Sequence, residues 1–323
     1  MHFRRSSSLF AALWLAHGVV SSQVPPAGEI YSRFGLGKPG EPIAGFAGGK
    51  FAMAAGEVVV FIGQENLVRE QKSGVMESML AAGFAEQKAR FRFMAWEADT
   101  VYEQWREANF GGWPAQLNAA EATMLVIQFG QMESLDGTGR LTEFTTAYHR
   151  LLDEFAQRTR RIVLLSPMPF EKPGASHAPN LPSRNADAKA YAEAVREIAA
   201  QRGAVFVDLF SPFVDNSASR LAKRRTRNGI HLTGQGLDLV GAEVARQLGI
   251  KLPVTLPAGM REEIVRKNQL WFDCWRPANW SFVYGDRISQ RYGRAGGGLP
   301  TLKASFERQL PLLQAAEKRV HAL

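Results

Sequence analysis

The stretch VVVFIGQENLVRE, from Val58 to Glu70, decides the fold that this sequence predicts. An unbroken apolar run reaches Gly63, and polar residues begin directly after it. A run of this kind is typical of a strand that lies buried in a parallel sheet and delivers its carboxyl end to a ligand site. The next two residues, Gln64 and Glu65, stand where a reactive side chain is expected, although neither is an ordinary nucleophile.

The same alternation of apolar runs and helical patterns continues along the chain. Four further strand candidates follow in the segments ARFRFMAW, TMLVIQFG, RRIVLLSP and AVFVDLF. The spacing of apolar residues predicts helices at 75–87, 141–159, 186–203 and 233–249. Strands that alternate with helices need crossover connections, which produce a parallel sheet. The sequence therefore predicts an α/β fold with five parallel strands over residues 57–250, and a site beyond the carboxyl ends of those strands.

The first 22 residues predict export. Arg4 and Arg5 precede the apolar run LFAALWLAHGVV, and small residues follow it, so we expect a signal peptide that is cleaved near Ser22. The run is shorter than the span of about 20 residues that a membrane helix needs. We therefore expect a secreted or periplasmic protein with no transmembrane segment after cleavage.

The remaining regions are a lead segment and a C-terminal extension. The lead, residues 23–56, is rich in proline and glycine and is expected at the surface. The extension, residues 251–323, has a tryptophan-rich part and closes with a predicted helix that Pro311 interrupts. The only cysteine, Cys274, excludes an internal disulfide. The formal net charge of +8 favours anionic partners such as acidic glycans or phospholipid surfaces.

One histidine is placed to reach the predicted strand edge. His231 lies in NGIHLTGQG, at the junction between a loop and a predicted helix. The other histidines lie in the signal peptide, within a helix, in a Pro-rich loop or at the terminus. An arrangement with a late histidine facing the end of the first strand is typical of a hydrolase, in which the imidazole acts as the base.

The order of these elements resembles the SGNH/GDSL hydrolases. That family has Gly-Asp-Ser after the first strand, Gly after the second, Gly-x-Asn after the third and a late Asp-x-x-His. The sequence is closer still to an exported subgroup found in planctomycetes and their relatives, in which the serine tends to be absent. The matching segments are FIGQENLVREQKSGVMESML, FRFMAWEADTVYEQWREANFG, FGQMESLDG, RIVLLSPMPFE, NADAKAYAEAVREIAAQRGAVFVDLF, NGIHLTGQG and RKNQLWFDCWRPANWSFVYGDR. The resemblance implies a three-layer α/β/α flavodoxin-like fold and hydrolysis of esters, in particular of acylated carbohydrate.

The resemblance also assigns positions at the site, and several hold altered residues. The Gly-Asp-Ser block corresponds to Gly63, Gln64 and Glu65, and the glycine after the second strand corresponds to Ala98. In the Gly-x-Asn block the glycine is Gly130 and the asparagine position holds Met132. In the late Asp-x-x-His block the two positions hold Asn228 and His231. Glutamate thus replaces the serine, methionine replaces the asparagine that would donate to the oxyanion, and asparagine replaces the aspartate. Ala98 keeps the backbone N–H that its position would supply.

These replacements weaken ester hydrolysis by serine chemistry. Glu65 has no proton to give up and would place negative charge where the acyl oxyanion develops. Losing one oxyanion donor, as at Met132, costs roughly 3–4 kcal/mol in transition-state stabilisation. Asn228 cannot stabilise an imidazolium as an aspartate does.

Three functions remain open at this point. The chain could be a hydrolase with weak or lost serine chemistry, a hydrolase that uses Glu65 and His231 as acid and base on a water molecule, or a non-catalytic module for a glycan or an anionic ligand. Possible ligand-binding residues are Trp96, Glu97, Asp99, Glu133, Arg224 and Arg225, and the aromatic residues Trp105, Phe110 and Trp113 could stack on sugar rings. The basic run at 220–228 could bind phosphate or a sulfated sugar, whereas export argues against nucleic acid. No metal or other cofactor is expected, because no ligand spacing supports one.

Overall fold

The computed structural model describes most of the chain. The described residues are 41–106, 111–173, 177, 179–214, 224–276, 280–282, 287, 289–291, 301, 304–305 and 308–323. The predicted signal peptide, Phe110 and the first part of the basic run lie outside them. No helix within these ranges combines the length and the apolar character that crossing a bilayer needs.

A five-stranded parallel sheet forms the centre of the molecule. Its strands are β1 (Val58–Gly63), β2 (Arg90–Phe93), β3 (Met124–Gln128), β4 (Ile162–Leu165) and β5 (Val205–Val207), in the order β2-β1-β3-β4-β5. Every strand pair is parallel, which confirms the predicted sheet. This order is that of the doubly wound, flavodoxin-like fold, in which the strand order reverses between β1 and β3 and a ligand site opens there.

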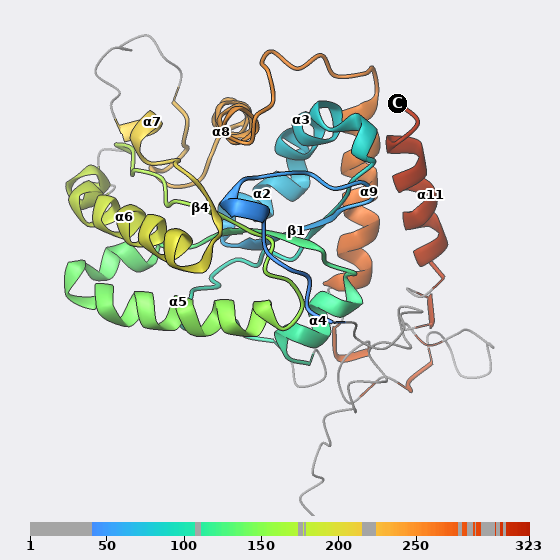
Figure 1. The fold of residues 1–323 in the computed structure, drawn as a ribbon, viewed down its shortest axis with the longest axis horizontal. Coiled ribbons are helices and arrows are strands. Elements are labelled where there is room, and N and C mark those ends of the chain that lie inside the picture. The colour runs from blue at the N-terminus through green and yellow to red at the C-terminus, as the bar shows by residue number, and fades with distance from the viewer. Residues whose placement is uncertain are drawn as a thin grey trace, which may run out of the picture.

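Helices cover both faces of the sheet, as Figure 1 shows. They are α2 (Glu65–Ser73), α3 (Val75–Gly83), α4 (Trp113–Ala119), α5 (Leu141–Ala156), α6 (Asn185–Arg202), α7 (Ser211–Val214), α8 (Gly234–Gln247), α9 (Met260–Trp275) and α11 (Leu310–Val320). Short 3-10 helices occupy Ala47–Gly49, Ala85–Gln87, Glu133–Asp136, Thr138–Arg140, Leu181–Arg184 and Trp280–Phe282. Successive strand residues point to opposite faces, so Val60 and Ile62 pack toward α4, α5 and α6, while Val59 and Phe61 pack toward α2, α3 and α8.

The structure adds detail at the start of two helices. No helix was assigned to residues 64–74 from the sequence, but α2 begins at Glu65 and is followed by Gly74, which adopts the left-handed conformation. Pro311 was expected to interrupt the last helical pattern, and α11 begins at Leu310 with Pro311 in its first turn. Proline is tolerated there because the first N–H groups of a helix have no partner within the helix.

The C-terminal extension covers the edge of the sheet at β2. Lys267 donates from Nζ to the Phe91 carbonyl at 2.9 Å, and Trp271 donates from Nε1 to the Phe93 carbonyl at 2.8 Å. Both carbonyls belong to the side of β2 that has no neighbouring strand. Helices α9 and α11 lie side by side in Figure 1, and α9 contacts β2. The extension therefore satisfies an edge that would otherwise be open to pairing with another chain.

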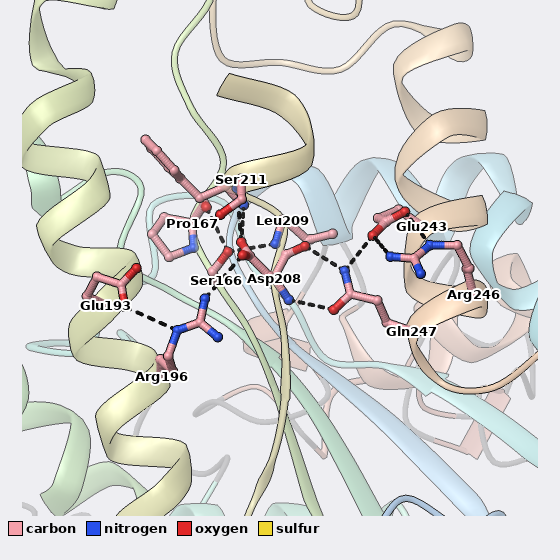
Figure 2. A network of polar contacts seen from close by, with 11 residues as sticks. Ser166, Pro167, Glu193, Arg196, Asp208, Leu209, Ser211, Glu243, Arg246 and Gln247 are labelled. Carbon is pink, nitrogen blue, oxygen red and sulfur yellow. Dashed lines mark hydrogen bonds and ion pairs between the residues drawn. The ribbon is translucent and has the colours of Figure 1, made fainter. Parts of the chain in front are cut away.

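At the other edge, a polar network fixes the end of β5 (Figure 2). Asp208 accepts backbone hydrogen bonds from Phe210 and Ser211 at 2.9 and 3.0 Å, and Arg196 of α6 contacts its other oxygen at 3.1 Å. Gln247 of α8 bonds to the backbone N–H and carbonyl of Asp208. Burial opposes ionisation of Asp208, but the hydrogen bonds outweigh it and lower the pKa. These contacts tie α6 and α8 to the end of β5.

Candidate active site

The candidate cleft lies where β1 and β3 end, at the reversal of strand order. A small pocket at this place is lined by Gln64, Glu65, Asn66, Gln128, Gln131, Met132 and Ile230. The lining thus combines the first, third and last blocks of the sequence pattern. Within the described residues, no group of three or more His, Cys, Asp or Glu side chains is placed to hold a metal ion.

Gly63 allows β1 to end against β3. Its φ is 152°, and a Cβ at this position would lie 2.3 Å from the Gln128 carbonyl oxygen. No other residue fits this approach without moving the strands apart. The glycine therefore positions Gln64 and Glu65 at the rim, with the half-buried Glu65 in the first turn of α2.

A buried carboxylate organises the loop after β3. Glu133 accepts hydrogen bonds from the Gly130 and Val101 backbone N–H groups at 2.9 and 3.0 Å and from Gln64 Nε2 at 3.0 Å. Burial raises the pKa of Glu133, while these donors act in the opposite direction. The side chain of Gln64 and the N–H of Gly130 are therefore engaged inside the protein. Met132 is instead 39% exposed at the cleft, where a thioether offers no hydrogen-bond donor.

The orientation of Asn228 determines which nitrogen of His231 can act. Asn228 Oδ1 accepts from the backbone N–H of His231 at 2.9 Å and from that of Ile230 at 3.3 Å. These two donors fix the amide, so its Nδ2 group faces His231 Nδ1 at 3.3 Å. An amide nitrogen only donates, so Nδ1 must accept, and a neutral imidazole then carries its proton on Nε2.

Contacts around Leu232 hold the histidine loop against α2. The Leu232 N–H donates to Asn66 Oδ1 at 3.4 Å, and Arg69 Nε donates to the Leu232 carbonyl at 2.9 Å. Asn66 follows Glu65, and Leu232 follows His231, so these bonds hold the backbone that carries Glu65 next to the backbone that carries His231. No role was assigned to Asn66 or Arg69 from the sequence, although both lie in the stretch that decides the fold.

The second block is held by two arginines. Trp96 lies between them, with Arg276 4.0 Å and Arg106 4.4 Å from the ring centroid. Arg276, just after α9, pairs with Glu97 at 2.5 Å, and Arg106 binds Asp99 through two bonds of 2.9 and 2.7 Å. We call this group the tryptophan clamp.

Ala98 lies between the two acidic residues of the tryptophan clamp. It is exposed and has a φ of 64°, the left-handed conformation that glycine adopts without strain. Burial opposes ionisation of both neighbours: the pKa of Asp99 is raised, whereas that of Glu97 is lowered because its hydrogen bonds outweigh burial. Both carboxylates thus have partners inside the protein, and the exposed backbone at Ala98 is open to a ligand.

The basic run divides into an engaged and an exposed residue. Arg225 is buried and donates to Glu171 at 2.6 Å and to the Phe213 carbonyl at 2.8 Å. Arg224 is exposed. Of the aromatic candidates, Trp113 lies in the core, whereas Trp105 is 76% exposed.

Comparison with known proteins identifies the family. Residues 69–239 match the model of the GDSL-like lipase/acylhydrolase family, which is more than half of the chain. The chain belongs to this family. The match begins at Arg69, after the first-block positions Gly63, Gln64 and Glu65. None of the curated proteins matches the sequence significantly.

Solved structures with a similar fold include several enzymes. An acetylxylan esterase from Geobacillus stearothermophilus is 17% identical over 62% of this chain and 98% of its own, with a TM-score of 0.46. A protein described as a GDSL-like lipase from Parabacteroides merdae is 18% identical over 62% of this chain and 100% of its own, with a TM-score of 0.47. The gut microbial diltiazem-metabolizing enzyme BT4096 is 19% identical over 62% of this chain and only 49% of its own, with a TM-score of 0.46. At these identities the likeness concerns the fold alone.

Proposed function

We propose that this GDSL-family protein binds an ester-bearing carbohydrate in its cleft and hydrolyses esters weakly or not at all. The observation that carries the proposal is the hydrogen bond from Asn228 Nδ2 to His231 Nδ1. It favours the tautomer with the proton on Nε2, so the nitrogen that takes the proton in a Ser-His-Asp triad has no free lone pair. In a serine protease the corresponding change of aspartate to asparagine lowers kcat by about ten-thousandfold.

Two further replacements act in the same direction. Glu65 at the nucleophile position has no proton to transfer and brings negative charge to the rim of the cleft. Met132 supplies no donor to an oxyanion, at a cost of roughly 3–4 kcal/mol in the best-studied comparison. Because the nucleophile, the partner of the base and an oxyanion donor are altered together, serine-esterase turnover is expected to be very slow.

Carbohydrate is the ligand class that we favour. The resemblance to ester hydrolases of acylated carbohydrate supports it, and the exposed ring of Trp105 is available to stack on a sugar. We also propose that residues 1–22 are a signal peptide and that the protein is secreted or periplasmic. The α/β domain would then span 57–250 and the extension 251–323.

Hydrolysis of p-nitrophenyl acetate tests the loss of serine chemistry. Wild-type protein and His231→Ala should have the same rate, close to that of buffer alone. A robust wild-type rate that His231→Ala abolishes would overturn the proposal.

A restoration experiment tests the assigned positions. The triple variant Glu65→Ser, Met132→Asn, Asn228→Asp reinstates nucleophile, oxyanion donor and imidazolium partner, and its rate should exceed that of wild type at least tenfold. The matched control carries Glu65→Ala with the same two other changes and should remain at the wild-type rate. Equal rates for the two triple variants would show that residue 65 is not the nucleophile position.

Acid–base hydrolysis by Glu65 and His231 is the second candidate. The bonds that Leu232 makes with Asn66, as donor, and with Arg69, as acceptor, favour it, because they hold the two segments together. This mechanism predicts measurable wild-type turnover of a glycan ester that both Glu65→Gln and His231→Ala abolish, with a bell-shaped pH profile.

Binding of an anionic ligand near Arg224 is the third candidate function. The exposure of the Arg224 side chain favours this candidate. Arg224→Ala should then weaken binding that is already sensitive to salt. Arg225 is unsuitable for this test, because its removal would leave Glu171 without that ion pair.

A further inference from the structure

A second hollow, separate from the cleft, lies over the first half of α5. Its volume is about 600 Å³, which is within the range of pockets that bind small molecules. Tyr102 and Gly139 line one end, and one face of α5 from Thr142 to Arg150 lines the remainder. The lining residues on α5 recur every three or four positions, so they form a continuous stripe along the helix.

The charges around this hollow leave one cation without a partner. Glu143 is paired with Arg140, through a bond of 2.9 Å from Nε, and Arg140 also lies 3.6 Å from Asp136. The anionic side chain of the lining is thus neutralised. Arg150 is exposed and makes no ion pair or hydrogen bond with any residue that the structure describes. The hollow therefore favours a ligand with a negative group at the Arg150 end.

The rest of the lining suits a ligand that is rich in hydroxyl groups. Thr146 Oγ1 donates to the Thr142 carbonyl at 2.8 Å, which leaves its oxygen lone pairs free to accept. The Tyr102 ring stands at the far end, with the Arg140 guanidinium 5.3 Å from its centroid. A sugar ring presents hydroxyls at its edge and C–H groups on its faces, so hydroxyl side chains and an aromatic ring recognise it together.

We propose that this hollow binds a uronic acid, a sugar that carries a carboxylate. The carboxylate lies on Arg150, the ring hydroxyls on Thr142 and Thr146, and a C–H face of the sugar against Tyr102. The planar guanidinium of arginine matches a carboxylate with two parallel bonds.

The site is close to the cleft but distinct from it. The residue before Tyr102, Val101, donates its N–H to Glu133 at 3.0 Å, and Glu133 follows Met132 of the cleft. The two hollows share no lining residue. The inference goes beyond the proposed function, because it does not depend on what the cleft binds or whether the cleft is catalytic.

Calorimetric titration with three probes tests it. The probes are free glucuronic acid, a xylo-oligosaccharide that carries one glucuronic acid, and the neutral xylo-oligosaccharide of the same length. Both acidic probes should bind at least tenfold more tightly than the neutral one, because a hydrogen-bonded charge pair contributes about that much affinity. A preference for the substituted oligosaccharide over free glucuronic acid would identify a polymer as the source.

Matched variants locate the binding. Arg150→Ala should remove the preference for the acidic probes, and Arg150→Lys should retain part of it. Tyr102→Ala should weaken binding of every probe, whereas Tyr102→Phe keeps the ring and the affinity. Arg160→Ala is the control, because Arg160 is also exposed but precedes β4, at the amino-terminal end of the parallel strands.

Three results would overturn the inference. They are equal affinity for acidic and neutral probes, an acid preference that survives Arg150→Ala, and binding of no probe at all. His231→Ala separates this inference from the proposed function, since it alters the cleft and should leave binding in the hollow unchanged. If His231→Ala alone removes binding of the acidic probe, the ligand lies in the cleft and the hollow is not its site.

Discussion

Buried carboxylates are stabilised differently at the cleft and at the β2 edge. At the cleft, Glu133 accepts from two backbone N–H groups and one amide side chain. At the edge, Glu77 pairs with Lys267 at 2.7 Å, and Arg92 pairs with Glu317. Neutral donors fix the shape of one loop, whereas ion pairs attach a remote segment to the domain. The buried carboxylate at the cleft is thus held by uncharged donors, and those at the edge are held by ion pairs that help to attach the extension.

The largest expected effect follows from breaking an ion pair at the edge. Burial lowers the pKa of Lys267 to about 8, and its partner Glu77 is also fully buried. Lys267→Met should reduce the free energy of unfolding by about 3–5 kcal/mol, since it leaves a buried charge unpaired. Urea denaturation measures the loss.

The double variant sharpens this prediction. Lys267→Met combined with Glu77→Leu removes both charges and should recover most of the stability, because apolar pairs often replace buried ion pairs without loss. A single variant as stable as wild type would show that the ion pair does not attach the extension.

Glu70 is a second buried carboxylate that, like Glu133, accepts its hydrogen bonds from uncharged donors. It accepts from the Met76 N–H at 3.0 Å and from Ser73 Oγ at 3.1 Å, and burial raises its pKa from 4.5 to about 7. The folded protein therefore binds this proton more tightly than the unfolded chain. The stability that Glu70 contributes is complete below pH 4.5 and is lost as the pH rises toward 7.

Glu70→Gln should accordingly be more stable than wild type above neutrality, by on the order of 2–3 kcal/mol. The difference should shrink as the pH falls toward the ordinary pKa of a glutamate. Thermal or urea unfolding over this pH range measures it. A constant difference at every pH would contradict the raised pKa.

The features of the fold and the site that the sequence predicted are those that depend on residues close together in the chain. The apolar run up to Gly63, and the similar runs in the other strands, predicted the sheet because periodicity is a local property. The positions of Gly63, Gln64, Asn228 and His231 at the ends of strands and helices could also be predicted from the sequence, since each follows a recognisable strand or precedes a helix.

Contacts between distant segments could not be predicted from the sequence. Arg276 reaches Glu97 from the far end of the sequence, and nothing in either segment indicates the pairing. The burial of Arg225 against Glu171 was missed for the same reason, because a run of basic residues gives no sign of which one turns inward.

The smallest expected effect concerns the tryptophan clamp. Arg276→Ala removes a half-buried ion pair and a contact with the Trp96 ring, at a cost of about 1 kcal/mol in unfolding free energy. Arg266→Ala is the matched control, because Arg266 is exposed and its partner Glu263 keeps a second ion pair, with Arg319. A larger loss of unfolding free energy for Arg266→Ala than for Arg276→Ala would show that the tryptophan clamp does not stabilise the protein.

The protonation of His231 tests the central claim most directly. Long-range ¹H–¹⁵N correlation spectra in mildly alkaline solution distinguish the two neutral tautomers, and His231→Ala assigns the signal. The account predicts a proton on Nε2 and an unprotonated Nδ1 that accepts from Asn228, with Asn228→Asp moving the proton to Nδ1. A wild-type imidazole that already carries its proton on Nδ1 would contradict the account, because Nε2 would then be free to act as the base.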